Sequence, residues 1–461
     1  MHISVSLMTL YNFFSNSLAC WLHKPVFILR VACIDNLRKI LLITMGSIFI
    51  LSTAQSQPVR RSENINHGFD SERIHRIDQV INDAISNGEI PGAVVLIRHN
   101  GKVAYHKCYG YSDIASKKMM ELNSIFRIAS MTKAITTVGV MILYERGHFL
   151  LNDPISKYIP EFKNPQILIE ADSAGNIVKT EPSRKEIRII DLLTHTSGLS
   201  YKFIPTQLQK VYEQNGILDA ITEQKITLAE QMKKLSGLPL LFEPSSKYQY
   251  GLSIDLLGYL CEVISKKSLE QFFTDEIFLP LKMFDTHFYL PHGKEDRLVK
   301  LYSWVDGKGL IEAKGNESPI KIDNVLFPVE GARTYFSGGG GLSSTAYDYG
   351  RFTQMLLNNG ELDEIRLLSR KTVELMITPR IDVNNDKIPE LGLGGFQIIN
   401  DIAKLGELGS NGAYVGGGAF YGTWLIDPEE NLTIVFMSQI MPARTYVADK
   451  FRIMVYQALI K

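Results

Sequence analysis

The two ends of this 461-residue chain carry matching patterns of helix and strand, and this symmetry constrains the fold more than any other feature. Residues 71–87 place apolar side chains at helical spacing, and two runs typical of strands follow at 92–100 and 102–110. Asn100 and Gly101 lie where these runs meet, and this pair of residues predicts a tight hairpin turn.

The far end of the chain repeats this unit in the opposite order. Residues 394–401, 422–429 and 432–439 are typical of strands separated by tight turns, and residues 447–460 are typical of a final amphipathic helix. The sequence therefore predicts an α+β fold, an α/β sandwich. One antiparallel sheet is built from both chain ends and flanked by the N- and C-terminal helices, and a mostly helical lobe is inserted between its halves.

The middle of the chain supplies the inserted lobe. Helical patterns alternate there with loops rich in glycine, proline and serine, and an exposed hairpin is expected within residues 166–180. We expect four parts: a leader at 1–56, a linker at 57–69, a sheet lobe formed by 70–112 with 330–461, and a helical lobe at 113–329 that carries the nucleophile.

The leader has the features of an export signal. Arg38 and Lys39 precede an uncharged run that ends at Thr53, and small residues follow at Ala54 and Ser56. As a helix this run would span roughly 21 Å, less than the ~30 Å of a hydrocarbon core. We predict cleavage near Ser56 and a periplasmic or extracellular protein. An uncleaved leader that anchors the chain to a membrane is the alternative.

Composition narrows the classes of partner. The 49 basic and 49 acidic side chains give a formal net charge of zero, so no electrostatic preference for nucleic acid or an anionic membrane is expected. No cysteine, histidine or carboxylate spacing typical of a metal site occurs, and we predict neither a metal nor a cofactor. A small-molecule substrate is the expected partner, and the oligomeric state is left open.

Ser130 and Lys133 stand at the start of residues 130–146, a segment that is apolar on almost every side. Residues three apart in a helix share one face. This segment predicts a central helix whose first turn opens on a cleft, where burial of the lysine stem disfavours the charged ammonium. A neutral amine there could take the serine proton. The alternative is a serine that caps the helix and a lysine whose amine reaches water.

Several longer stretches resemble one known family, the serine β-lactamase and penicillin-binding protein superfamily. The likeness covers about residues 70–445 and is closest to the class C-like branch that contains carboxylesterases. It is carried by IFRIASMTK around Ser130, LLTHTSGL at 192–199, YQYGLSIDLLGYLCEVIS at 248–265, IFLPLKMFDTHFY at 277–289, GGGGLSSTAYDYGRF at 338–352 and LIDPEENL at 425–432.

The resemblance assigns roles to three residues. It implies that Ser130 is the acylated nucleophile, Lys133 its activating partner, and Tyr250 the proton shuttle to the leaving group. Family members that recognise penicillin have an asparagine two residues after this tyrosine. Leu252 stands there instead, so this part of the chain is similar to the esterase version of the motif.

The third family motif falls on the segment YVGGGAFYGTW. Gly416 takes the place of the family's lysine, histidine or tryptophan, and the cation that would hold a β-lactam carboxylate is absent. Gly417 and Gly418 permit a substrate to lie close to the strand, and the backbone N–H of Ala419 is expected to share an oxyanion hole with that of Ser130. A looser or impaired site at Gly416 remains the alternative.

Two other motifs do not support a different chemistry. His195 suggests a Ser–His–Asp triad, but the chain has no G-x-S-x-G elbow, and we interpret this histidine as structural. The glycine-rich segment 337–342 lacks the lysine of a phosphate-binding loop.

The sequence thus predicts an exported serine hydrolase that cleaves ester or amide bonds of small substrates. A β-lactamase or D-amino-acid peptidase is one alternative, and a non-catalytic sensor is another.

Overall fold

The structure is a computed structural model that describes residues 67–318, 320–322, 324–383 and 390–460. The export signal and linker expected before residue 67 lie outside these residues. The described residues belong to a single compact unit. The finer division into a sheet lobe and a helical lobe stays a prediction. No helix among the described residues combines the length and apolar character needed to cross a bilayer.

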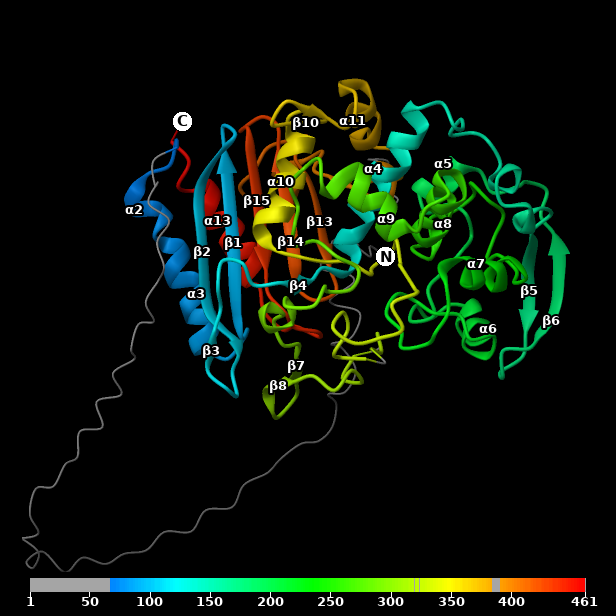
Figure 1. Cartoon of the computed structure of the whole chain (residues 1–461), viewed down its shortest axis with the longest axis horizontal. Helices are drawn as coiled ribbons and strands as arrows, with labels where there is room; N and C mark the ends of the chain where they lie inside the picture. Colours follow the sequence, from blue (N-terminus) through cyan, green and yellow to red (C-terminus); the bar gives the residue numbers. More distant parts are fainter. Residues whose placement is uncertain (1–66, 319, 323, 384–389, 461) are drawn as a thin grey trace, which may run out of the picture. The chain divides into compact units, whose positions relative to one another are not determined.

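The described residues form one large antiparallel sheet of seven strands, in the order β12-β13-β14-β15-β1-β2-β3 (Figure 1). Strands β1 to β3 come from the start of the unit and strands β12 to β15 from its end, as the mirrored patterns predict. The strands are β1 Gly92–His99, β2 Lys102–Asp113, β3 Lys118–Met119, β12 Gln397–Ile398, β13 Tyr414–Gly418, β14 Gly422–Asp427 and β15 Leu432–Met437.

Strands β1 and β15 join the two halves in the middle of the sheet. Val94 pairs with Met437 and His99 with Leu432. On its other side β1 pairs with β2 through the predicted hairpin, where Asn100 and Gly101 both adopt positive φ angles, 52° and 73°. An Asn-Gly pair accepts this conformation at little cost, which fixes the hairpin at the predicted place.

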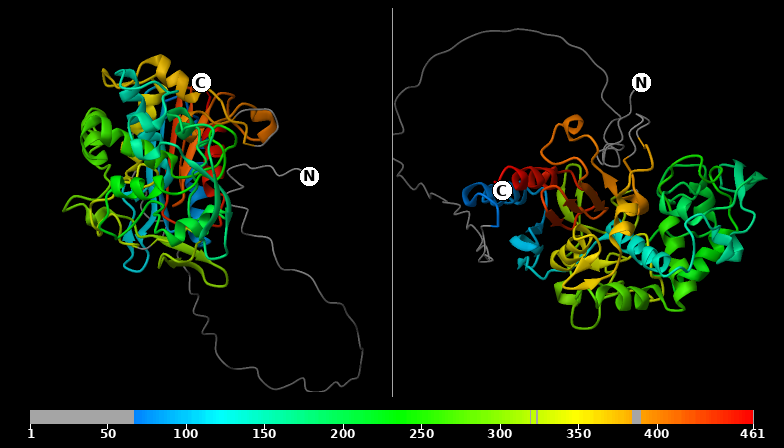
Figure 2. Two further views of the ribbon diagram at one scale, coloured as in Figure 1. Left: turned by 90° about the vertical axis from the view of Figure 1, so that its right-hand side faces the viewer. Right: turned by 90° about the horizontal axis from the view of Figure 1, so that it is seen from above.

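Both faces of the sheet are covered, so every residue of β1 is buried. Ala93, Val95 and Ile97 face one hydrophobic cluster, which also contains residues of α3 (Arg76–Ser86) and α13 (Val447–Tyr456). These two terminal helices lie side by side against that face (Figure 2). Strand residues of opposite parity face a second cluster, which continues into the helical part of the unit.

The helical part lies beside the second face, and the β5–β6 hairpin forms its far end (Figure 1). Its central helix is α4 (Thr132–Glu145), in which every residue from Thr132 to Leu143 is buried. The other helices are α5 Ile189–Leu193, α6 Leu208–Gln214, α7 Leu228–Ser236, α8 Ser253–Ser265, α9 Leu269–Phe273 with a π-helical turn at Thr274–Phe278, α10 Ala346–Leu357 and α11 Arg370–Ile377.

Short elements complete the fold. Helix α2 Ser71–Ile74 precedes α3, and helix α12 Ile402–Leu405 lies between β12 and β13 in sequence. The small strand pairs are β4 Phe126–Arg127 with β9 Ser343–Ser344, β5 Gln166–Ala171 with β6 Ile177–Pro182, β7 Tyr302–Val305 with β8 Gly309–Glu312, and β10 Glu361–Leu362 with β11 Ile365–Arg366. No disulfide joins Cys108 to Cys261 within the described structure.

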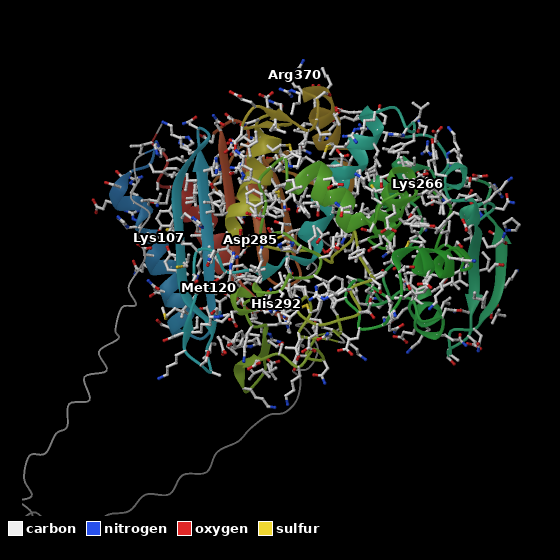
Figure 3. All side chains as sticks on the ribbon, in the orientation of Figure 1. Lys107, Met120, Lys266, Asp285, His292 and Arg370 are labelled. Carbon is white, nitrogen blue, oxygen red and sulfur yellow. The ribbon has the colours of Figure 1, made fainter. Side chains whose placement is uncertain are left out.

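A polar network ties β2 to α3 inside the apolar layer. Lys107 lies on β2 (Figure 3). Its ammonium donates to both carboxylate oxygens of Asp78, at 2.9 and 2.8 Å, and the hydroxyls of Tyr105 and Tyr109 each donate to the same carboxylate at 2.7 Å. Only 3% of the Lys107 side chain is exposed, so this ion pair is largely shielded from water. It fixes how α3 sits on the sheet.

The structure differs from the sequence expectations at strand β12, at helices α6 and α11, at the β7–β8 hairpin and at Ser130. The strand expected at 394–401 shrinks to Gln397–Ile398, because Gly394 and Gly395 take positive φ and form a turn against α4. Helices α6 and α11 and the β7–β8 hairpin were not expected. Ser130 lies in a single 3₁₀ turn, η1 (Ala129–Met131), immediately before α4 rather than within its first turn.

Candidate active site

The turn that carries Ser130 is held from both sides. β4 pairs with β9 just before it, and the Ile128 N–H donates to the Leu342 carbonyl at 3.0 Å. Ala129 adopts a φ of 44°, a left-handed conformation that costs a residue with a Cβ of the order of 1 kcal/mol and that clusters at functional sites. The backbone therefore turns sharply immediately before Ser130.

The structure brings Ser130, Lys133 and Tyr250 together, although Tyr250 is far away in sequence. The Tyr250 hydroxyl donates to Ser130 Oγ at 2.7 Å, and Lys133 Nζ lies 3.3 Å from the same oxygen. Lys133 is 4% exposed, and its amine also donates to the Gly339 carbonyl at 2.6 Å. The serine hydroxyl is thus flanked by two groups that can exchange a proton with it.

Aromatic rings enclose the lysine amine. Lys133 Nζ lies 4.6 Å from the centroid of the Tyr250 ring and 5.2 Å from that of the Tyr201 ring. The two rings are 5.3 Å apart. Ring faces attract a cation and exclude water, so the amine is confined to the space between the rings, Gly339 and Ser130. Tyr201 is a part of the site that sequence reasoning missed, since a lone aromatic in a loop carries no motif.

His195 lies behind Tyr250, with the two ring centroids 5.0 Å apart. It is fully buried, and neither ring nitrogen makes a hydrogen bond within the described structure. Burial, helped by the nearby Lys133 charge, lowers the pKa of His195 to about 3. This imidazole is neutral at ordinary pH and supports the Tyr250 ring, and no hydrogen bond links it to Ser130.

The end of strand β13 runs against the nucleophile turn. A Cβ added at Gly418 would lie 2.2 Å from the Ile128 carbonyl oxygen, so only glycine allows this approach. Gly417 precedes it in the strand, and Ala419 follows at an exposed position. Neither the Ser130 N–H nor the Ala419 N–H donates a hydrogen bond to any described residue, so both donors are available to a substrate.

Comparison with known proteins decides the family. The family profile described as Beta-lactamase matches residues 77–458, most of the chain. The chain belongs to the beta-lactamase family. Esterase EstB of Burkholderia gladioli is 28% identical over 374 residues, 79% of this chain and 89% of the esterase. An uncharacterized protein of Mycobacterium tuberculosis is 32% identical over 375 residues, 78% of this chain and 89% of that protein.

Solved structures agree with this assignment. EstCE1, titled a hydrolase with promiscuous acyltransferase activity, superposes with a TM-score of 0.72 at 26% identity and covers 85% of this chain and 99% of its own. The resemblance of the sequence to the β-lactamase and penicillin-binding superfamily is therefore confirmed, and so is the α+β fold class. The chain is an enzyme of the serine hydrolase type, related to esterases.

Strand β14 explains the departure from the family pattern at Gly416. Trp424 pairs with Gly416 across the sheet, and a Cβ added at Gly416 would lie 2.7 Å from the indole ring. Trp424 is 3% exposed and is wedged among the rings of Tyr349, Phe396 and Tyr414. A side chain at position 416, where the resemblance implies the family's lysine, histidine or tryptophan, would meet this indole.

The second departure, Leu252, is equally well packed. It is fully buried at the start of α8, and its backbone N–H donates to the Ser200 carbonyl at 3.4 Å. The leucine side chain has no hydrogen-bonding group to offer a substrate. The site therefore has no side-chain amide at position 252 and no cation at position 416.

Proposed function

We propose that this enzyme hydrolyses ester or amide bonds of small substrates through an acyl-enzyme formed on Ser130. One observation carries the proposal: Ser130 Oγ lies 3.3 Å from a buried lysine amine and 2.7 Å from the Tyr250 hydroxyl. Such a pair of neighbours can remove the hydroxyl proton during attack and return a proton to the leaving group.

In the first half-reaction Ser130 Oγ attacks the substrate carbonyl carbon while its proton passes to Lys133. The carbonyl oxygen becomes an oxyanion that accepts hydrogen bonds from the backbone N–H groups of Ser130 and Ala419. Gly417 and Gly418 have no side chains, so the acyl group can lie against strand β13.

Collapse of the tetrahedral intermediate expels the alcohol or amine. Tyr250, whose hydroxyl already contacts Ser130 Oγ, donates a proton to the leaving atom and recovers one from Lys133. In the second half-reaction water attacks the acyl-enzyme, its proton follows the same route in reverse, and Ser130 leaves as the restored hydroxyl. The sum is hydrolysis of one ester or amide bond.

The substrate preference follows from what the site lacks. With Gly416 in the place of a cation and Leu252 in the place of an asparagine, no side chain at these positions would hold an anionic carboxylate. We therefore propose neutral esters or amides as substrates ahead of penicillin-like anions. The relatives include an enzyme named as an esterase, which supports this preference.

The test compares p-nitrophenyl butyrate with nitrocefin, using the wild type and Ser130→Ala. We expect turnover of the ester by the wild type only, and slow or no opening of nitrocefin. Faster acylation by nitrocefin would favour a β-lactamase or a D-amino-acid peptidase instead. Well-folded protein whose Ser130 stays unlabelled by a fluorophosphonate probe, as judged by mass spectrometry, would favour a non-catalytic sensor.

We also propose that the protein is exported to the periplasm or the extracellular space, on the basis of residues 38–56. Expression in a bacterial host with a functional secretion system tests this proposal. Mass spectrometry of the mature protein should place its first residue near position 57, and an intact leader would contradict cleavage.

A further inference from the structure

We infer that Asp255 is a positioning residue for the catalytic pair of Ser130 and Lys133. It holds the Lys133 amine against Ser130 through the peptide of Gly339. This inference rests on the proposed function, because it assigns a purpose to a residue that acts on Lys133. Asp255 does not touch Ser130, and nothing in the S-x-x-K spacing points to it.

Asp255 is a fully buried carboxylate on α8. Its Oδ1 accepts hydrogen bonds from the Ser337 hydroxyl at 2.5 Å and from the Gly339 N–H at 3.1 Å. Its Oδ2 faces the Tyr201 hydroxyl at 3.5 Å. A carboxylate buried to this degree is costly unless its acceptors are satisfied, and a structural role alone could be filled by an uncharged side chain.

The Gly339 peptide links this carboxylate to the lysine. Its N–H donates to Asp255, while its own carbonyl accepts from Lys133 Nζ at 2.6 Å. A Cβ added at Gly339 would lie 2.2 Å from Asp255 Oδ2 and 2.6 Å from the Tyr201 hydroxyl, so the link requires glycine here. This gives a purpose to the glycine-rich segment 337–342, which sequence reasoning could only exclude as a phosphate loop.

The same segment is anchored a second time, without Asp255. Thr136 on α4 donates its hydroxyl to the Gly338 carbonyl at 2.7 Å. Gly338 also passes close to α8, where an added Cβ would lie 2.9 Å from the Ile254 carbonyl oxygen. Thr136 therefore offers a matched control: it holds the same segment in place but carries no charge.

The Asp255 carboxylate interacts with the Lys133 charge, which the uncharged Thr136 cannot do. Burial raises the pKa of Asp255, whereas the Ser337 hydrogen bond and the Lys133 charge act in the opposite direction. The carboxylate and the amine therefore interact electrostatically, in addition to the link that the Gly339 peptide makes between them. Thr136 holds the same segment without such an interaction.

Several ionisable groups near Lys133 keep the same charge over the pH range of the test. Burial holds the pKa values of Tyr201 and Tyr335 well above 10, and Asp219 and Asp255 add to this. The pKa of His195 is about 3. None of these three changes its charge between about pH 5 and pH 9. Tyr250 also contacts the pair, through Ser130.

The decisive variant is Asp255→Asn, which keeps the shape and the acceptor oxygen but removes the charge. Rates of Ser130 labelling by a fluorophosphonate, and kcat and KM for p-nitrophenyl butyrate, are measured from pH 5 to pH 9. We expect the acid limb of kcat/KM to move to lower pH by about one unit, because an opposite charge is lost. The plateau of kcat should fall about tenfold with little change in KM, because the Lys133 amine is held less firmly against Ser130.

Two further variants separate positioning from stability. Thr136→Val should lower the melting temperature without moving the acid limb. Asp255→Ser is also uncharged and is smaller, so it should move the limb in the same direction and keeps the test available if Asp255→Asn does not fold.

A folded Asp255→Asn enzyme with the wild-type pH profile and kcat would overturn the inference. A wild type that no probe labels at Ser130 would instead overturn the proposed function, so the two failures are distinguishable.

Discussion

Replacing Gly416 by alanine tests whether Trp424 leaves room for a side chain at position 416. The only atom added is a Cβ, and it would lie 2.7 Å from Cζ2 and 2.8 Å from Cε2 and Nε1 of Trp424. Carbon atoms pack at about 3.5–4.0 Å, so the indole must move by most of an ångström. It has little freedom to do so, because Phe396 lies 5.6 Å away ring to ring, and Tyr414 and Tyr349 lie 6.2 and 6.3 Å away.

The expected cost is that of overpacking a buried site, about 1–3 kcal/mol. Replacing glycine also lowers the conformational entropy of the unfolded chain, which offsets about 0.4–1 kcal/mol of this cost. A net destabilisation is therefore expected. At about 2.1 cal/mol/K of unfolding entropy per residue, a unit of about 400 residues should lose about 1–3 °C in melting temperature. Gly237→Ala is the matched control, since a Cβ there would meet nothing closer than 3.5 Å and the φ angle of −79° is ordinary.

Thermal unfolding of four proteins measures the effect: wild type, Gly416→Ala, Trp424→Leu and the double variant. Leucine lacks the three indole atoms nearest to Gly416, so the alanine should cost less in that background, with a coupling of about 0.5–3 kcal/mol. Gly416→Lys should likewise fail to gain nitrocefin hydrolysis while Trp424 is present. An alanine variant as stable as the wild type, or equal costs in both backgrounds, would refute the argument.

Three other predictions concern ionisable groups. Lys133→Met should lower kcat/KM for p-nitrophenyl butyrate by about 10²–10⁴-fold and suppress labelling of Ser130, because the general base is lost. His195 has a pKa of about 3 when folded and about 6.5 when unfolded, so protonation of the unfolded chain removes stability as the pH falls below about 6.5. His195→Asn should weaken this pH dependence in denaturant titrations at pH 7 and pH 5. Despite burial, hydrogen bonds from Lys107 and two tyrosines lower the pKa of Asp78, so its stabilisation is present above about pH 4 and lost below it. Lys107→Met should destabilise the protein by about 1–3 kcal/mol and flatten its acid-unfolding curve, because a partly buried carboxylate loses its cation.

Local patterns were sufficient to predict the sheet. The alternation in 92–110 and 422–439 and the Asn-Gly turn are properties of neighbouring residues, and the structure confirms a sheet shared by both chain ends. Helix α11 and the β7–β8 hairpin were missed because they are short: the helix has eight residues and each strand of the hairpin has four. The strand at β12 was predicted too long, since the positive φ of Gly394 and Gly395 arises from contact with α4.

The contacts of the active site are likewise of two kinds: some join residues that are close in sequence, and others join distant segments. Ser130 and Lys133 are three residues apart, so their proximity is encoded locally and was visible in the sequence. The contacts of Gly339 with Asp255 and of Gly416 with Trp424 join segments that are distant in the chain or lie on different strands. No spacing rule encodes such contacts, because they depend on how the helices and strands pack. The resemblance to a family was what located Tyr250.

The central position of β1 and β15 has a consequence for synthesis of the protein. One side of β1 stays without its partner until residues 432–437, close to the end of the chain, have left the ribosome. A nascent chain with an unpaired strand edge invites pairing with other chains. Premature termination before β15 should therefore yield insoluble aggregates rather than a smaller soluble domain, and the full-length polypeptide should benefit from chaperones that delay its collapse.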